Sequence, residues 1–260
     1  MGNDSTQKTV TVAFLLCVVC SVLVSTAAVV LRPKQDANKS LDIKKNLLLA
    51  AGLLNNPKAT ANDVNKAFEV VETKLIDLKT GNDVEGVDID SFDVKKAAKD
   101  PKFSVSIPSN KDIARIRQKS KYGKVYLIKK DGSVDQIVLP FHGKGLWSTM
   151  YGFISLAPDT KTVKGIGYYE HGETPGLGGE VDNANWKKSW VGKKVLSDSY
   201  SPIVDVIKGS VDSTNAESYH QIDGLSGATM TSNGVEAMVN YWLSEEGYGP
   251  FLARFRAGGI

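Results

Sequence analysis

The chain has 260 residues, of which 42% are hydrophobic and 23% are charged. These proportions are typical of a globular protein and exclude a largely disordered chain. The formal net charge is only +3, and the lysines are scattered rather than grouped. We therefore expect no nucleic-acid partner.

The N-terminal part of the sequence predicts a membrane helix. Residues 10–31 contain no charged side chain, and this stretch is long enough to cross a hydrocarbon layer of about 30 Å. We expect a cytoplasmic N-terminus over residues 1–9 and a single transmembrane helix over 10–31. A signal peptide cleaved near 25–28 is the alternative. The basic residues that follow the span would, by local charge alone, keep the C-terminal side in the cytoplasm.

The two cysteines, Cys17 and Cys20, both lie inside this apolar stretch. Their spacing could suit a metal or redox pair, but we interpret them as small apolar membrane residues. The rest of the chain has no thiol for a disulfide, a zinc site or an iron–sulfur cluster. Any redox chemistry therefore requires a bound cofactor.

Residues 32–112 are predicted to form helices and loops after the membrane. A leucine-rich pattern over 41–54 predicts a helix that ends near Pro57. Thr60 and Asp63 form the signature of a capped second helix. The apolar face assigned to that helix comprises Val64, Phe68, Val71, Leu75 and Leu78. Residues 80–112 are read as a loop with short helical pieces.

Residues 113–260 are predicted to form an α+β domain with a mostly antiparallel sheet and flanking helices. A hairpin is expected around Asp131-Gly132. The other expected elements are strands at 151–157, 163–169 and 203–207, a short helix at 186–191, an amphipathic helix from Val235, and a glycine-rich tail from Glu245.

A turn of small residues, 223–232, precedes the amphipathic helix. Thr231 or Ser232 is the expected cap, and a helix start favours a bound phosphate. A purely structural turn is one alternative. A hydrolase nucleophile elbow at Ser226 is another, although Ala228 stands where the last glycine should be, and 218–223 does not read as a strand.

The string Asp223-x-x-Ser226-Gly227-Ala228-Thr229 resembles the flavinylation motif of bacterial FMN-binding domains. With the segments 143–147 and 171–178, the chain resembles the family that contains the C subunits of sodium-translocating NADH:quinone reductases. The string Glu-Thr-Pro-Gly-Leu-Gly is shared with the G subunit of Rnf complexes. The resemblance implies that a flavin transferase joins FMN covalently, through its phosphate, to Thr229.

The same resemblance directs attention to residues that could hold the flavin ring. An isoalloxazine ring needs a flat apolar surface and a few polar partners. Trp147 and Leu177 are candidates for the surface, and Glu173 and Thr174 for the polar edge. Gly178 is a further candidate cofactor-binding residue. A core aromatic at 147 and a plain loop at 176–179 are the structural alternatives.

The resemblance implies an electron-transfer component of a complex that oxidises NADH, reduces a ubiquinone-type quinone and pumps Na+. Expected partners are the flavin-carrying B subunit, the iron–sulfur D and E subunits, the flavin transferase and membrane lipid. The soluble domain is expected on the periplasmic side of the bacterial inner membrane, against the local charge bias. The G subunit of an Rnf ferredoxin:NAD oxidoreductase, a flavin-free anchored binding module and a serine hydrolase are the alternatives.

Two other kinds of site are not expected. The segment from Gly143 begins like a dinucleotide fingerprint, but Ser148 replaces the third glycine, so we predict no NADH site in this chain. His142, His171 and His220 lack the spacing of a helical metal pair. We expect them to be loop histidines and predict no metal.

Overall fold

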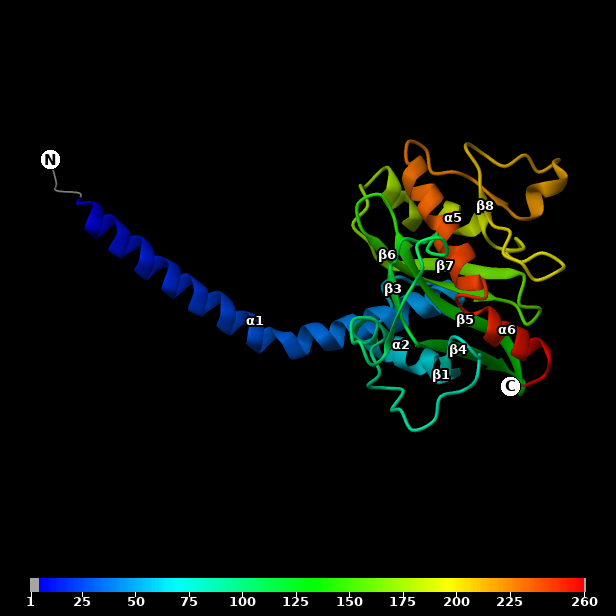
Figure 1. The fold of residues 1–260 in the computed structure, drawn as a ribbon, viewed down its shortest axis with the longest axis horizontal. Coiled ribbons are helices and arrows are strands. Elements are labelled where there is room, and N and C mark those ends of the chain that lie inside the picture. Colours follow the sequence, from blue (N-terminus) through cyan, green and yellow to red (C-terminus); the bar gives the residue numbers. More distant parts are fainter. Residues whose placement is uncertain (1–4, 260) are drawn as a thin grey trace. The chain divides into compact units, whose positions relative to one another are not determined.

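The computed structural model describes residues 5–259 and divides into two compact units, one ending at Ile43 and one beginning at Lys44. Residues 1–4 of the predicted cytoplasmic N-terminus and residue 260 lie outside the described part. Helix α1, Thr6–Ala50, is the principal element of the first unit and continues into the second (Figure 1). By length and composition it can cross a membrane.

Helix α1 does not break after the membrane stretch, so the prediction of a separate helix at 41–54 is wrong. Pro33 lies inside α1, where a proline removes one backbone donor and clashes with the preceding turn at a cost of about 3 kcal/mol, yet the 45-residue helix continues through it. The helix ends at Ala50 because Gly52 adopts φ +69° and the amide of Leu53 bonds to the carbonyl of Leu48 at 2.9 Å, which is a glycine C-cap.

The second unit is built on a five-stranded antiparallel sheet in the order β1-β4-β5-β6-β7, as the α+β prediction requires. The strands are β1 Val71–Asp77, β4 Tyr122–Lys130, β5 Ser133–Lys144, β6 Thr149–Leu156 and β7 Val163–Glu170. The predicted hairpin is confirmed. Asp131 and Gly132 both have positive φ, as a two-residue hairpin turn of type I′ demands.

The edge strand β1 replaces part of a predicted helix. Helix α2, Ala61–Phe68, has the expected capping box between Thr60 and Asp63. The helix prediction is wrong beyond it, because Val71–Asp77 pairs with β4 along its whole length. The apolar spacing of this segment suits a strand as well as a helix. Backbone pairing of its seven residues with β4 favours the strand.

Helices cover both faces of the sheet. Ile137, Leu139 and Phe141 alternate along β5 into the main core, which they share with α5, Thr229–Leu243, and α6, Gly249–Arg256. Helix α6 lies within the glycine-rich tail, for which the sequence analysis predicts no helix. On the other face, the last turn of α1 lies against β7, where Gly165 and Gly167 leave room for Ala50.

Trp242 fixes the C-terminal end of α5. Strand β4 stops pairing with β5 after Tyr126 and Val138. The indole Nε1 donates to the carbonyl oxygen of His142 at 2.7 Å, and the centres of the two rings lie 4.9 Å apart. Trp242 therefore replaces the missing β4 partner of this part of β5.

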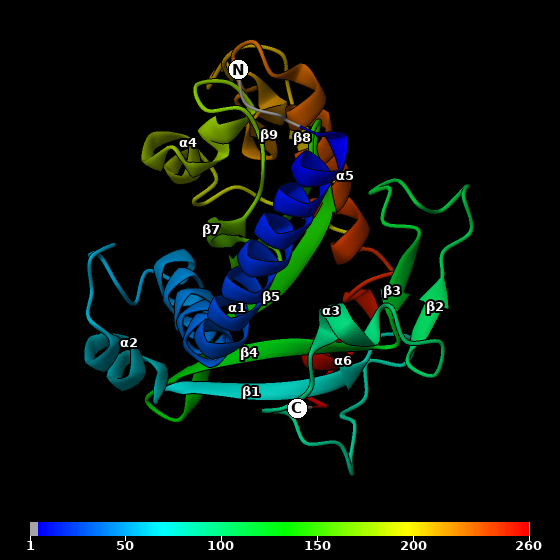
Figure 2. The ribbon, with the colours of Figure 1, turned by 90° about the vertical axis from the view of Figure 1, so that its left-hand side faces the viewer.

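Shorter elements surround the sheet (Figure 2). Helix α4, Ala184–Ser189, confirms the predicted short helix, and α3, Val94–Ala97, the predicted helical piece of the long loop. The strand predicted at 203–207 is reduced to β8, Asp205–Val206, which pairs in parallel with β9, Gln221–Ile222. Elements not predicted are β2 Ser104–Ser106, β3 Gln118–Ser120, η1 Gly178–Asp182 and η2 Ala216–Tyr219.

The close approach of α1 to β7 predicts unequal effects of two similar substitutions. A Cβ at Gly165 would lie 2.1 Å from the carbonyl oxygen of Ala50, whereas one at Gly167 would lie 3.4 Å from its nearest neighbour. We expect Gly165→Ala to lower the free energy of unfolding by about 1–3 kcal/mol through overpacking, and Gly167→Ala to change it little. Urea denaturation of both variants measures this, and equal effects would contradict the packing.

Candidate functional site

The turn between β9 and α5 presents two free hydroxyl groups. Helix α5 begins at Thr229, earlier than predicted, and its N-cap is Ala228, with no side-chain cap. The predicted cap by Thr231 or Ser232 is wrong because both hydroxyls are used elsewhere and both residues are buried. Ser226 and Thr229 are exposed, and neither hydroxyl has a hydrogen-bond partner within residues 5–259.

The start of α5 is suited to an anion. The first turn of a helix leaves backbone N–H groups without helical partners, and the helix dipole adds partial positive charge there. Within the described residues 5–259, no side chain caps the start of α5. Thr229 occupies the first helical position, so an anionic group on its hydroxyl would lie beside them.

The loop after β8 and helix α4 hold this turn in place. The carboxylate of Asp223 accepts a hydrogen bond from the amide of Val211 at 2.7 Å. The backbone carbonyl of Asp223 accepts another from Nε1 of Trp186 at 2.8 Å. Gly224 passes so close to the neighbouring loop that a Cβ would lie 2.2 Å from the carbonyl oxygen of Ile207. Gly227 has φ +70°, and a Cβ there would lie 3.0 Å from Leu177.

Glu173 lies at the centre of the site, with only 5% of its surface exposed. Its Oε1 accepts hydrogen bonds from the amides of Trp147 at 3.0 Å and Ser148 at 3.1 Å. Its Oε2 accepts one from the amide of Leu146 at 3.1 Å and one from the hydroxyl of Thr231 at 2.7 Å. One carboxylate thus joins the β5–β6 turn, its own loop and the first turn of α5.

These bonds keep Glu173 ionised. Burial alone would raise its pKa. The hydroxyl of Thr231 and the amides of Ser148, Trp147 and Leu146 outweigh that effect, so the pKa lies below the ordinary 4.5. The site therefore contains a fixed negative charge at neutral pH.

An apolar rim lies on the segments that Glu173 and the turn connect. Trp147 is 68% exposed and Leu177 is 43% exposed. Leu146 and Met230 belong to the same group of exposed apolar side chains. Large exposed apolar side chains on adjoining segments indicate a binding surface rather than a core.

The remaining predicted residues shape the 171–178 loop. Thr174 is exposed, and its carbonyl accepts hydrogen bonds from the amides of Leu177 at 3.1 Å and Gly179 at 2.9 Å. Gly178 is buried against Glu173 and Thr231. The structure thus links the predicted site residues into one region around the start of α5.

Comparison with known proteins identifies the family. Residues 145–244 match the family model of the FMN-binding domain. The C subunit of the Na(+)-translocating NADH-quinone reductase of Pseudomonas aeruginosa is 45% identical over 258 residues, which is 99% of this chain and 98% of the relative. The chain belongs to the family of the C subunits of these reductases. The corresponding protein of Haemophilus ducreyi is 48% identical over 257 residues, or 98% of this chain and 96% of the relative.

Solved structures of members of this family have the same fold. The crystal structure of Shewanella oneidensis NqrC matches with a TM-score of 0.77 and 34% identity, covering 85% of this chain and 99% of that one. The C subunit from Parabacteroides distasonis matches with a TM-score of 0.65 and 27% identity, covering 85% and 96%. The FMN-binding match begins at residue 145 and therefore includes both apolar rim segments and the start of α5.

The histidines differ from one another in the structure. His142 is not the expected loop histidine, because it lies in β5 and stacks on Tyr151 at 5.2 Å. His171 bonds through Nε2 to the carboxylate of Asp182 at 2.8 Å, which raises its pKa. His220 follows η2. Among residues 5–259, no three His, Cys, Asp or Glu side chains form a group suited to a metal ion.

Sequence reasoning does not identify Thr231 and Ser148 as parts of the site. Thr231 donates to Glu173, and the hydroxyl of Ser148 accepts a hydrogen bond from the amide of Gly172 at 2.7 Å. The sequence indicates Thr231 only as a cap. No local signal distinguishes a threonine that caps a helix from one that reaches a carboxylate 58 positions away.

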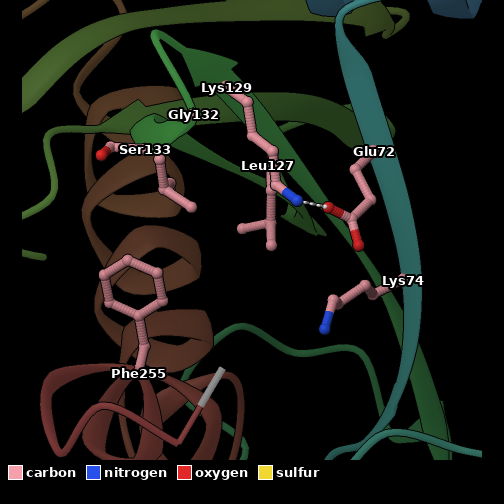
Figure 3. Close-up of a pocket in the computed structure, with 8 residues that line it drawn as sticks. Glu72, Lys74, Leu127, Lys129, Gly132, Ser133 and Phe255 are labelled. Carbon is pink, nitrogen blue, oxygen red and sulfur yellow. Dashed lines mark ion pairs between the residues drawn. The ribbon is translucent and has the colours of Figure 1, made fainter.

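A cavity of about 400 Å³ lies elsewhere, at the β4–β5 hairpin (Figure 3). Glu72 and Lys129 form an ion pair of 2.6 Å beside it, with Leu127 and Phe255 among the lining residues. Ser133, also in the lining, is at the opposite end of β5 from Lys144, about 35 Å away at the usual rise of a strand. None of the predicted site residues lines this cavity.

The burial of His142 predicts its titration. Burial first, and the nearby charge of Lys95 second, lower its pKa to about 4. Because the folded pKa lies below the unfolded value of about 6.5, His142 should lower stability progressively as the pH falls from about 6.5 toward 4. The NMR chemical shifts of the imidazole carbons should titrate with a midpoint near 4. A midpoint near the ordinary value would contradict the burial.

Proposed function

We propose that this chain is an electron-transfer subunit that carries FMN covalently linked to Thr229. The observation that carries the proposal is that the hydroxyls around the start of α5 differ in burial and hydrogen bonding. Thr231 and Ser232 are buried and hydrogen-bonded, whereas Thr229 is exposed, has no hydrogen-bond partner among residues 5–259, and lies at the first position of a helix without a side-chain cap.

A phosphodiester-type link at Thr229 fits the local chemistry. The phosphate would lie at the N-terminus of α5, where backbone N–H groups lack a side-chain cap and favour an anion. Gly227 and Ala228 place no bulky side chain beside it. Ser226 is the other exposed hydroxyl, but it precedes the helix, so the amides of the first turn are less directly placed for its phosphate.

This chain's own residues would bind the flavin and orient its ring. Trp147 and Leu177 would cover the ring, while Thr174 and Gly178 shape the loop beside it. FMN supplies the capacity to accept and release single electrons. The protein's contribution is position: a covalent link prevents loss of the carrier, and the exposed rim leaves one edge accessible to a partner's redox centre.

We further propose that the chain works within a sodium-translocating NADH:quinone reductase. Its relatives are named as C subunits of such reductases, which favours this complex over an Rnf complex. The proposed partners are the flavin-carrying B subunit and the iron–sulfur D and E subunits, with NADH bound outside this chain and a ubiquinone-type quinone as the final acceptor. The soluble unit is proposed to be periplasmic, anchored in the inner membrane by α1, and matured by a flavin transferase.

A serine hydrolase has little support in the geometry. A two-residue strand, β9, does precede the turn, contrary to the sequence prediction. Yet the hydroxyl of Ser226 has no histidine partner among residues 5–259. A hydrolase requires a base within hydrogen-bond reach of its nucleophile.

Thr229→Ala is expected to abolish covalent FMN without unfolding the protein. The hydroxyl is exposed and makes no hydrogen bond within the described residues, so its removal should change the free energy of unfolding by less than about 0.5 kcal/mol. Flavin fluorescence of the band on a denaturing gel, after co-expression with a flavin transferase, measures attachment.

Ser226→Ala is the matched control for this experiment, because it removes the other free hydroxyl of the same turn. It should keep the fluorescent band. A fluorescent Thr229→Ala band together with a dark Ser226→Ala band would move the attachment to Ser226.

Asp223→Asn should slow flavin attachment more than it affects folding. Asparagine retains an acceptor for the amide of Val211 but loses the negative charge that the transferase motif contains. We expect a lower labelling rate with a melting temperature close to that of the unmodified sequence. Full labelling at the normal rate would show that this charge has no part in the motif.

A further inference from the structure

We propose that Glu173 is a positioning residue that couples the β5–β6 turn, which carries Trp147 and is called here the Trp147 turn, to the start of α5. The carboxylate of Glu173 does not bind the flavin itself. This inference rests on the proposed function, because the coupled elements are the ring-covering side chain and the helix that bears Thr229. It assigns to Glu173 a role different from the polar contact with the ring that the sequence suggests.

The hydrogen-bond capacity of the Glu173 carboxylate is fully used within the protein. A carboxylate offers about four lone-pair positions. Three amides and the hydroxyl of Thr231 occupy them at 2.7–3.1 Å, and the hydroxyl of Ser148 adds a longer contact of 3.4 Å. Glu173 is also almost wholly buried, since only 5% of its surface is exposed. No oxygen lone pair remains for an external ligand.

Two glycines, Gly145 and Gly178, leave space beside the Glu173 carboxylate. A Cβ at Gly145 would lie 2.6 Å from Oε1 of Glu173. A Cβ at Gly178 would lie 2.9 Å from Oε2 and 2.5 Å from the hydroxyl oxygen of Thr231. Neither glycine has a positive φ, so backbone conformation does not require glycine there. Space for the carboxylate and its partner does.

Each hydrogen bond to Glu173 positions a different part of the site. Leu146, Trp147 and Ser148 direct three successive amides at Glu173, so the carboxylate fixes the backbone of a turn whose tryptophan side chain is largely exposed. Thr231 lies two positions after Thr229 in α5. Glu173 therefore sets the position of Trp147 relative to the attachment hydroxyl.

The charged groups around Glu173 bond to other atoms, so among the described residues its carboxylate accepts hydrogen bonds only from the three amides and the hydroxyls already described. Nδ1 of His171 faces the backbone amide of Glu173 at 3.3 Å, and its other nitrogen is bonded to Asp182. The ammonium of Lys144 donates to the carbonyl oxygen of Trp147 at 3.1 Å. None of these groups bonds to the Glu173 carboxylate. At a pH below the lowered pKa of Glu173, protonation would turn one acceptor oxygen into a donor that faces amides.

The test is a pair of variants of the full chain loaded with covalent FMN, Glu173→Gln and Glu236→Gln. Glu236 is a matched control because it is a partly buried carboxylate on α5 whose Oε2 accepts a backbone amide, that of Val206, at 2.9 Å. Flavin fluorescence intensity and anisotropy report how Trp147 quenches and confines the ring. Denaturing gels and melting temperatures report attachment and folding.

We expect Glu173→Gln to retain covalent FMN while flavin anisotropy falls and intensity rises severalfold, because the Trp147 turn is released. Glu236→Gln should leave both signals unchanged. In a Trp147→Ala background, Glu173→Gln should add nothing to the intensity, since the two changes act through one contact. In the unsubstituted protein, anisotropy should fall when Glu173 is protonated, at a pH below the ordinary carboxyl pKa of 4.5 because the pKa of Glu173 is lowered, and this step should be absent in Glu173→Gln.

A folded Glu173→Gln protein with unchanged anisotropy and intensity would overturn the inference. So would a shifted flavin absorption spectrum without increased ring mobility, which would indicate direct contact with the ring. If Glu173→Gln does not fold, Thr231→Val removes a single donor and should change both signals in the same direction; no change would again overturn it. Absence of flavin from the unsubstituted protein would instead contradict the proposed function.

Discussion

The hydrogen-bonded carboxylate of Glu173 is the constraint on which the site depends. A buried charge is tolerated only when its hydrogen bonds replace those of water, and here the donors come from segments 25–58 positions away. The pairing of Tyr151 with Glu170 already places the loop after β7 beside the β5–β6 turn, and the carboxylate joins the first turn of α5 to these two segments. The glycines at 145 and 178 follow from the same requirement, because they leave the space it occupies.

Helix α5 is held at both ends, which makes it a rigid support for a covalent carrier. At its C-terminal end, Trp242 bonds to an unpaired carbonyl of β5. At its N-terminal end, the hydroxyl of Thr231 donates a hydrogen bond to Glu173, and the hydroxyl of Ser232 accepts one from the amide of Leu225. Because the hydroxyls of Thr231 and Ser232 form these bonds, they do not cap the helix. The backbone N–H groups of its first turn therefore have no side-chain cap beside Thr229. Functional groups on supported helices are held more accurately than groups on free loops.

Sequence patterns give correct predictions where the signal is local. The hairpin at Asp131-Gly132 follows from a turn that needs two positive φ values, and the Thr60–Asp63 capping box from spacing alone. The apolar spacing of Val71–Asp77 suits a helix or a strand, and only pairing with β4 decides between them. Helix α6 escapes prediction because Gly249-Pro250 resembles a loop, although proline is well tolerated at a helix start.

The site shows the same division between local and distant information. The motif 223–229 and the segment around Glu173 are recognisable as strings of residues. The partners of Glu173 are not, since long-range hydrogen bonds leave no periodic trace in the sequence. The prediction of the α5 cap is wrong for this reason: Thr231 and Ser232 have the chemistry of caps, but tertiary contacts use their hydroxyls.

The central claim is that the free hydroxyl at the start of α5 carries FMN in the working protein. Peptide mass spectrometry of the chain isolated from its native membrane tests it most directly. The account predicts that the peptide containing Thr229 carries the mass of esterified FMN, with fragmentation placing the modification on that residue. An unmodified Thr229 peptide from an active complex would contradict the account.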